Sequence, residues 1–113
     1  MIDARREEVY MNRVDNKGKV LSDVEAKVIT VNSFYDETEK GMSVHLIGDG
    51  AAKFEDLFKD KTNVIVHKDF YPSAQYMIPL SSASFKDKTF EDVAYFEPYY
   101  LKDFIAIKPR KIF

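Results

Sequence analysis

Two stretches, EVYMNRV at residues 8–14 and VLSDVEAKVITV at residues 20–31, decide the fold of this chain. In each stretch apolar residues alternate with polar or charged ones, which is typical of a strand that buries one face. Between them lies DNKG, residues 15–18, in which asparagine and glycine both tolerate a positive φ. The sequence therefore predicts an antiparallel β-hairpin near the N-terminus.

Beyond Val31 the hydrophobic period changes from that of strands to that of helices. The expected elements are a helix at about 33–40 ended by Gly41, a strand at 43–48, a helix at 51–59, a strand at 63–67 and a helix at 73–85. In the last helix Met77, Leu80 and Phe85 are the apolar residues, and Pro79 should kink it or split it. A hairpin followed by alternating helices and strands predicts an α/β fold, in which one mixed sheet holds all these strands and helices cover it.

Length and composition restrict the possible functions. A chain of 113 residues forms a single domain, and its net charge of −2 argues against a dedicated polyanion binder. Cysteine is absent, so disulfides, thiolate nucleophiles and sulfur-ligated zinc are excluded. No stretch reads as a signal peptide or as a membrane span, and we expect a soluble, cytoplasmic protein with no membrane partner.

Gly48-Asp49-Gly50 follows a predicted strand and precedes a predicted helix. The amides of such a turn can hold a phosphate at a helix N-terminus, which makes these three residues a candidate nucleotide site. The competing interpretation is a tight strand-to-helix turn, and it is the more frequent one for a single G-x-G.

Charged residues crowd the N-terminus, where Asp3, Glu7 and Glu8 surround Arg5 and Arg6. Grouped carboxylates can bind a metal ion or transfer protons. Here the arginines supply ready partners, and Glu7 and Glu8 would point to opposite faces of a strand. A charge-paired turn is the favoured interpretation.

Little else in the sequence indicates catalysis. His45 and His67 lie in different predicted strands, without the spacing of a metal pair, and no serine stands in a nucleophile elbow. We therefore expect no enzymatic activity, no metal and no cofactor.

The last part of the chain is rich in aromatic and basic residues. Residues 90–113 hold seven of the sixteen aromatic side chains, and basic residues follow at Lys102, Lys108, Arg110 and Lys111. Such a mixture can stack on bases or anchor a protein interface. We expect Tyr95 and Tyr99 to complete the core, and the tail after Phe104 to contact a partner.

Two motifs carry a family resemblance, IDARREEVY at residues 2–10 and AYFEPYYLKDF at residues 94–104. In this order and spacing they resemble the second half of the TsaB (YeaZ) family, whose members are labelled glycoprotease-like. The resemblance implies a ribonuclease-H-like half-domain of the actin-like ATPase group, with residues 1–113 as one C-terminal domain and the first half absent. It also implies a non-catalytic role in making threonylcarbamoyladenosine in tRNA. The partners would be the catalytic TsaD-type subunit and a TsaE-type ATPase, with tRNA contacted indirectly.

The resemblance and the composition together suggest the residues that meet partners: Asp3, Arg5, Tyr100, Lys102, Lys108 and Arg110. Two alternative functions stay open, a nucleotide-binding domain of the actin-like group that uses Gly48–Gly50 and an RNA-binding module that uses the basic aromatic tail. We also expect the domain to form homodimers, either through the edge of the N-terminal hairpin or by exchange of the aromatic tail, because unpaired edges and bare apolar faces favour association.

Overall fold

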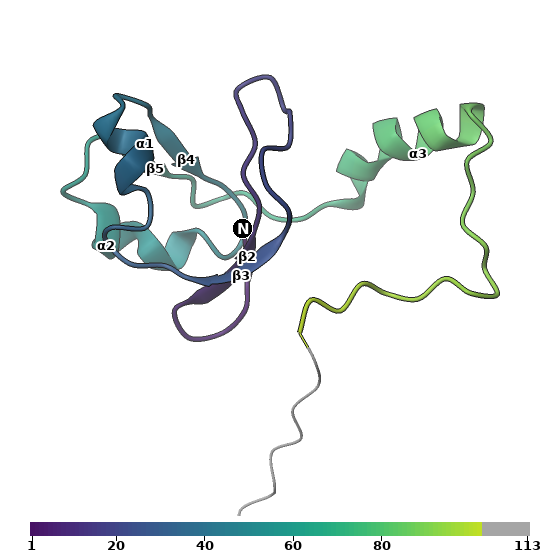
Figure 1. Ribbon diagram of the computed structural model, residues 1–113, viewed down its shortest axis with the longest axis horizontal. Coiled ribbons are helices and arrows are strands. Elements are labelled where there is room, and N and C mark those ends of the chain that lie inside the picture. Colours follow the sequence, from purple (N-terminus) through teal and green to yellow (C-terminus); the bar gives the residue numbers. More distant parts are fainter. Residues whose placement is uncertain (103–113) are drawn as a thin grey trace, which may run out of the picture.

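The computed structural model describes residues 1–102, and these divide into a packed body and an arm that stands away from it (Figure 1). The body comprises residues 1–69, and the arm comprises residues 70–102. The radius of gyration is 17.9 Å, whereas a compact domain of this length would have a value of about 13 Å. The arm therefore makes the molecule far more open than its length requires.

The N-terminal hairpin is present as expected. Strands β1 (Ile2–Asp3), β2 (Glu8–Met11) and β3 (Glu25–Val28) form an antiparallel sheet in that order. A further bridge pairs Val14 with Val20 beyond the ends of β2 and β3. The hairpin prediction is confirmed, although its regular strands are shorter than the alternating stretches.

The later strands form a sheet of their own, so the prediction of one shared sheet is wrong. Strand β4 (Val44–Leu46) pairs in parallel with β5 (Val64–Val66), and neither pairs with β1, β2 or β3. The segments that follow β4 are joined to the start of the chain at Met1, whose ammonium group donates to the carbonyl oxygen of Ile47 at 2.5 Å and whose carbonyl oxygen accepts from the amide of Gly50 at 3.4 Å. Because β1 has only two residues, it is too short to extend the ladder from one sheet to the other.

Short helices occupy the expected positions. They are α1 (Tyr35–Glu39), the 3₁₀ turn η1 (Ala52–Phe54) continued by α2 (Glu55–Phe58), and the 3₁₀ turn η2 (Ala74–Met77) continued by α3 (Ile78–Lys86). Pro79 stands in the first turn of α3, where its missing amide costs no hydrogen bond, so the predicted split at this proline is confirmed. Within residues 1–102, no helix has the length and apolar character that crossing a bilayer requires.

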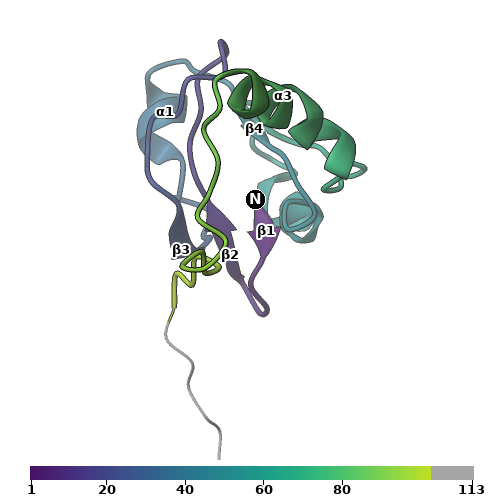
Figure 2. The ribbon, with the colours of Figure 1, turned by 90° about the vertical axis from the view of Figure 1, so that its right-hand side faces the viewer.

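The core lies between the hairpin sheet, the β4–β5 pair and helices α1 and α2 (Figures 1 and 2). Its buried members all belong to the body: Val9, Met11, Ile29, Phe34, Leu46, Ala51, Phe54, Phe58 and Val64. The rings of Phe34 and Phe58 pack with their centroids 5.7 Å apart. The apolar side chains on the strands and helices of the body therefore pack together in one small core.

The arm contributes nothing to this core, which contradicts the expectation for its tyrosines. Tyr95 is 84 % exposed and Tyr99 is 81 % exposed, so the prediction that they complete the core is wrong. The chain leaves the body after β5, and every residue from 67 to 100 is exposed. Helix α3 and the extended segment after it run through solvent before the chain returns beside the hairpin (Figure 2).

Candidate functional site

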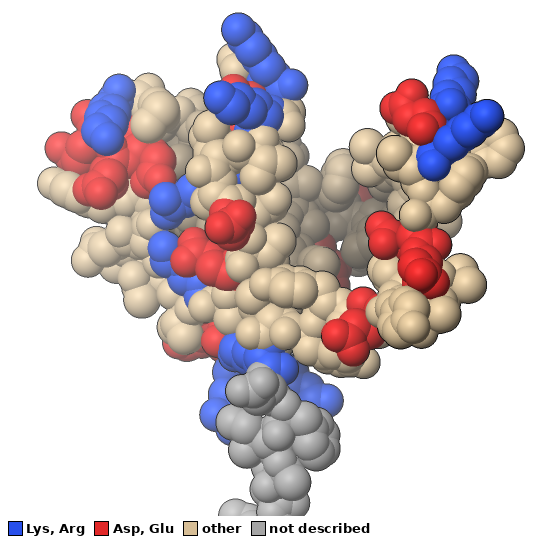
Figure 3. All heavy atoms as spheres, turned by 45° about the vertical axis from the view of Figure 1, so that its right-hand side comes forward, with Lys and Arg blue, Asp and Glu red and all other residues tan. Residues whose placement is uncertain are grey.

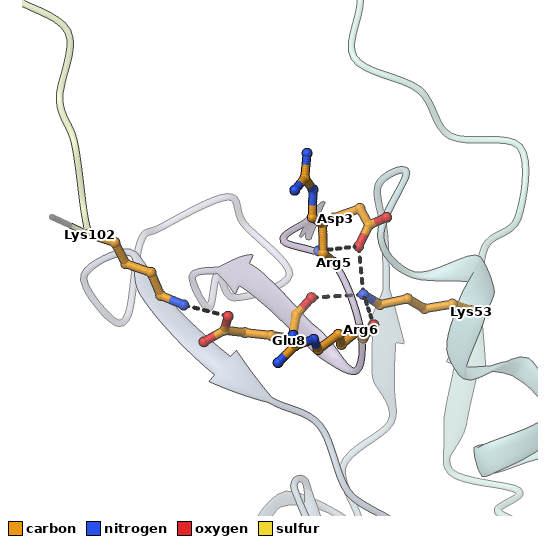
Figure 4. Close-up of polar contacts among 6 residues, drawn as sticks. All are labelled: Asp3, Arg5, Arg6, Glu8, Lys53 and Lys102. Carbon is orange, nitrogen blue, oxygen red and sulfur yellow. Dashed lines mark hydrogen bonds and ion pairs between the residues drawn. The ribbon is translucent and has the colours of Figure 1, made fainter. Parts of the chain in front are cut away.

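Lys53 connects the helical part of the body to the turn between β1 and β2 (Figure 4). Its ammonium group donates to the carboxylate of Asp3 at 2.6 Å and to the carbonyl oxygens of Arg6 at 2.8 Å and Glu8 at 2.7 Å. These three acceptors use all the donors of one ammonium group. Lys53 therefore acts as a crosslink between segments about fifty positions apart, a role that no local sequence pattern indicated.

Asp3 and Arg5, two residues of the N-terminal motif, build the same turn. The carboxylate of Asp3 accepts a hydrogen bond from the backbone amide of Arg5 at 3.0 Å. Arg5 and Arg6 both have positive φ, 68° and 52°, a conformation that costs energy outside glycine and needs such support. The hydrogen bond from Lys53, and then the bond from the Arg5 amide, lower the pKa of the Asp3 carboxyl group. The turn is charge-paired as expected, but the partner of Asp3 is Lys53, and the expectation that Arg5 or Arg6 would fill this role is wrong.

The acidic residues of this region do not converge. Glu8 lies in β2 and forms an ion pair with Lys102 of the arm, while Asp3 pairs with Lys53 (Figure 4). Among residues 1–102, no group of three or more histidine or carboxylate side chains is placed to hold a metal ion.

Gly48 and Gly50 lie against the backbone of the first residues of the chain. A Cβ atom on Gly48, whose φ is 115°, would stand 2.0 Å from the carbonyl oxygen of Met1. A Cβ atom on Gly50 would stand 2.9 Å from the amide nitrogen of Asp3, and the Gly50 amide already donates to Met1. Close packing alone explains both glycines, whereas the nucleotide site at Gly48-Asp49-Gly50 stays a prediction.

The two histidines, which sequence reasoning treated as separate, are neighbours. His45 lies in β4 and His67 follows β5, and their Nδ1 and Nε2 atoms are 2.9 Å apart with the rings stacked at 5.2 Å between centroids. The parallel pairing of β4 with β5 brings them together. Both histidines are exposed, so they form a surface pair that joins two strands.

An open hollow of about 350 Å³ lies beside the Lys53 crosslink. Its lining combines apolar Ile29, Phe54 and Leu57 with charged Arg6 and Glu7. Lys53, which also lines the hollow, is committed to Asp3 and two carbonyl oxygens. The hollow therefore presents an apolar floor and mixed charge, without a free nucleophile–base pair among its lining residues.

The most unusual surface of the described chain is the arm. Thirteen large apolar side chains of the arm are between 44 % and 93 % exposed: Phe70, Tyr71, Tyr76, Met77, Ile78, Leu80, Phe85, Phe90, Val93, Tyr95, Phe96, Tyr99 and Tyr100. Some pair locally, such as Phe70 with Tyr76 at 5.7 Å between centroids and Phe85 with Phe90 at 5.9 Å. Exposed apolar surface of this extent is characteristic of sites of protein association.

At the far end of the arm, the side chain of Lys102 contacts the body. The ammonium group of Lys102 pairs with the carboxylate of Glu8 and lies 5.8 Å from the centroid of the Tyr10 ring. Tyr100, the other residue of this part that we expected to meet a partner, is 80 % exposed. Lys108, Arg110 and the tail after Phe104 lie outside the described residues.

Comparisons with known proteins identify no relative. No protein-family model matches the chain, and neither the curated proteins nor the solved structures include a match.

Proposed function

We propose that this chain is a non-catalytic interaction subunit of the TsaB type, and that the arm is its binding element. The observation that carries the proposal is the exposure of every residue from 67 to 100 in a segment rich in aromatic side chains. Monomeric proteins rarely leave apolar surface of this extent in water, and large exposed apolar patches mark sites of protein association.

Helix α3 strengthens this argument. It has nine residues, whereas isolated helices shorter than about 12–15 residues are only marginally stable in water. Its apolar residues Ile78, Leu80 and Phe85 are 63 %, 72 % and 72 % exposed. A helix that buries none of its own apolar side chains gains stability when a partner covers them.

The narrower part of the proposal rests on the two sequence motifs. The IDARREEVY and AYFEPYYLKDF segments support a role beside a TsaD-type catalytic subunit and a TsaE-type ATPase in tRNA threonylcarbamoyladenosine modification. The first motif includes the turn that Lys53 crosslinks, and residues 94–102 of the second lie in the arm. The motifs therefore correspond to one structural turn and one exposed surface.

A ribonuclease-H-like fold is part of the same proposal. An antiparallel hairpin sheet followed by a parallel strand pair, with the two joined at Met1, supports it.

Binding of a purified TsaD-type subunit, measured by calorimetry, tests the proposal. The native chain should form a complex, and the double change Tyr95→Ser with Phe96→Ser should weaken it at least tenfold, because aromatic anchors dominate interface energies. The change Tyr35→Ser, at a tyrosine of α1 that is 53 % exposed, is the matched control and should leave the affinity unchanged. The proposal fails if the native chain does not bind, or if the arm variant binds as well as the control.

A further inference from the structure

We infer that His45 and His67 form a binding site for one late first-row divalent transition ion, Cu²⁺ above all, with water in the remaining coordination positions. The parallel pairing of β4 with β5 brings these two histidines together, although they are 22 positions apart (Figure 1). Imidazole nitrogen suits copper, nickel and zinc, whereas magnesium and calcium prefer oxygen ligands. The inference departs from the expectation of no metal, which considered only the spacing of the histidines in the sequence. It concerns the body and does not depend on the function proposed for the arm.

The backbone holds both histidines on the outer face of the β4–β5 pair. In β4, Leu46 is buried and His45 is exposed. In β5, Val64 is buried whereas Ile65 is exposed, and His67 lies on the same side as Ile65 because side chains alternate along an extended chain. The amide of His67 donates to the carbonyl oxygen of Leu46 at 2.9 Å, which fixes the backbone at this point. Ligands carried on paired strands are held more precisely than ligands carried on loops.

The distance between the facing nitrogens suits a chelated ion. His45 Nδ1 and His67 Nε2 are 2.9 Å apart. For an ion at about 2.0–2.1 Å from both nitrogens, the usual distance from zinc to imidazole, the two bonds would meet at about 90°. Neighbouring ligands make this angle in the square-planar and tetragonal sites of Cu²⁺ and Ni²⁺, whereas tetrahedral Zn²⁺ prefers a wider one. Since Cu²⁺ also heads the affinity order of these ions, we expect it to bind most tightly.

The hydrogen bond between the two rings is compatible with metal binding. One of the facing nitrogens carries the shared proton, and a neutral imidazole can carry that proton on its other nitrogen instead. Each ring then has its proton on the nitrogen that faces away from its neighbour. This change of tautomer leaves both rings neutral, as metal ligation requires, and it frees both facing lone pairs for the ion.

The charges that flank His67 in the sequence allow a cation to bind. The ammonium group of Lys68 pairs with the carboxylate of Glu55, so this positive charge is compensated. Asp69 adds a negative charge two positions beyond His67. On the face of the molecule drawn in Figure 3, basic side chains lie among acidic ones, and the net charge of the chain is −2. A general attraction of cations is therefore weak, and tight binding has to come from the two imidazoles.

Titration of the native chain with Cu²⁺, on protein prepared without a polyhistidine tag, tests the site. Calorimetry should give one ion per chain, and the electron paramagnetic resonance spectrum should show two imidazole nitrogens on that ion. His45→Gln and His67→Gln should each abolish this binding, because even the loss of an outer-shell partner of a metal ligand costs about 10–100-fold in affinity. Ile65→Gln is the matched control, since Ile65 is the register partner of His45 and its replacement keeps both imidazoles. This variant should bind Cu²⁺ as the native chain does.

Urea denaturation adds a second readout. An ion that bridges β4 and β5 should raise the urea midpoint of the native chain and of Ile65→Gln but not of the histidine variants, because a ligand that binds only the folded state stabilises it. The midpoints without metal show whether each variant folds.

Three results would overturn the inference. The first is a native chain that binds no Cu²⁺. The second is a pair of independent sites, in which each single histidine variant still binds an ion at the remaining histidine and the spectrum shows one imidazole on each ion. The third is binding that persists when both histidines are replaced by glutamine. These measurements use the chain and the metal alone, so their outcome is separate from the binding of a TsaD-type subunit.

Discussion

Replacing Gly48 by alanine should destabilise the body much more than the same replacement at Gly41. Both glycines have positive φ, 115° at Gly48 and 75° at Gly41. A Cβ atom on Gly48 would lie 2.0 Å from the carbonyl oxygen of Met1, whereas a Cβ atom on Gly41 would meet nothing within 4 Å. Comparing the two variants therefore separates the cost of the close contact from the cost of backbone strain.

The expected magnitudes follow from these contacts. At Gly41 the left-handed conformation costs alanine about 1–2 kcal/mol, offset by about 0.4–1 kcal/mol because alanine restricts the unfolded chain. A net loss of about 1 kcal/mol is therefore expected there. At Gly48 the backbone must also move away, which costs about 1–3 kcal/mol by analogy with overpacked cores. Losing the Gly50–Met1 hydrogen bond adds about 1 kcal/mol.

Urea denaturation followed by far-UV circular dichroism measures the difference. An excess cost of about 2–4 kcal/mol at Gly48, with a slope near the middle of the usual range of about 1–3 kcal/mol per molar urea, lowers the midpoint by about 1–2 M relative to Gly41→Ala. Equal midpoints for the two variants would refute the packing explanation. A Gly48→Ala chain that unfolds normally and loses binding to ATP would favour the nucleotide alternative instead.

Three further changes test the body. Lys53→Met should lower the free energy of unfolding and speed amide exchange in the β1–β2 turn, because three acceptors lose their donor. Lys59→Met, at an exposed lysine of the same segment, is the control and should change neither quantity. Since the folded state lowers the pKa of Asp3, its carboxylate stabilises the fold above the ordinary aspartate pKa, and that contribution should disappear as the pH falls below about 4. Asp3→Asn should make acid unfolding curves shallower over this range, and an unchanged pH dependence would contradict the assignment. Phe58→Ala should cost about 3–5 kcal/mol in urea denaturation because the ring is buried against Phe34, whereas Tyr35→Ala at an exposed site should stay within about 0.5 kcal/mol.

Local patterns in the sequence determined the elements of the body. Alternation in 8–14 and 20–31 produced the hairpin, and Pro79 separated η2 from α3, because strand pleat, turn conformation and proline geometry depend on near neighbours. Apolar spacing also identified core members such as Phe54 and Phe58. These features depend on side chains that lie within a few residues of each other in the sequence.

Only the tertiary structure decided how those elements combine and which surface stays bare. The pairing of β4 with β5, the approach of His45 to His67 and the Lys53 crosslink all join residues twenty or more positions apart, and no periodicity encodes such contacts. The arm is the clearest case of a feature that local sequence patterns do not determine. An aromatic segment predicts burial against something, because apolar surface avoids water. The path of the chain after β5 determines whether this apolar surface is buried against the protein's own core or stays available to another molecule. Here the chain runs away from the body, and the thirteen large apolar side chains of the arm stay exposed to solvent.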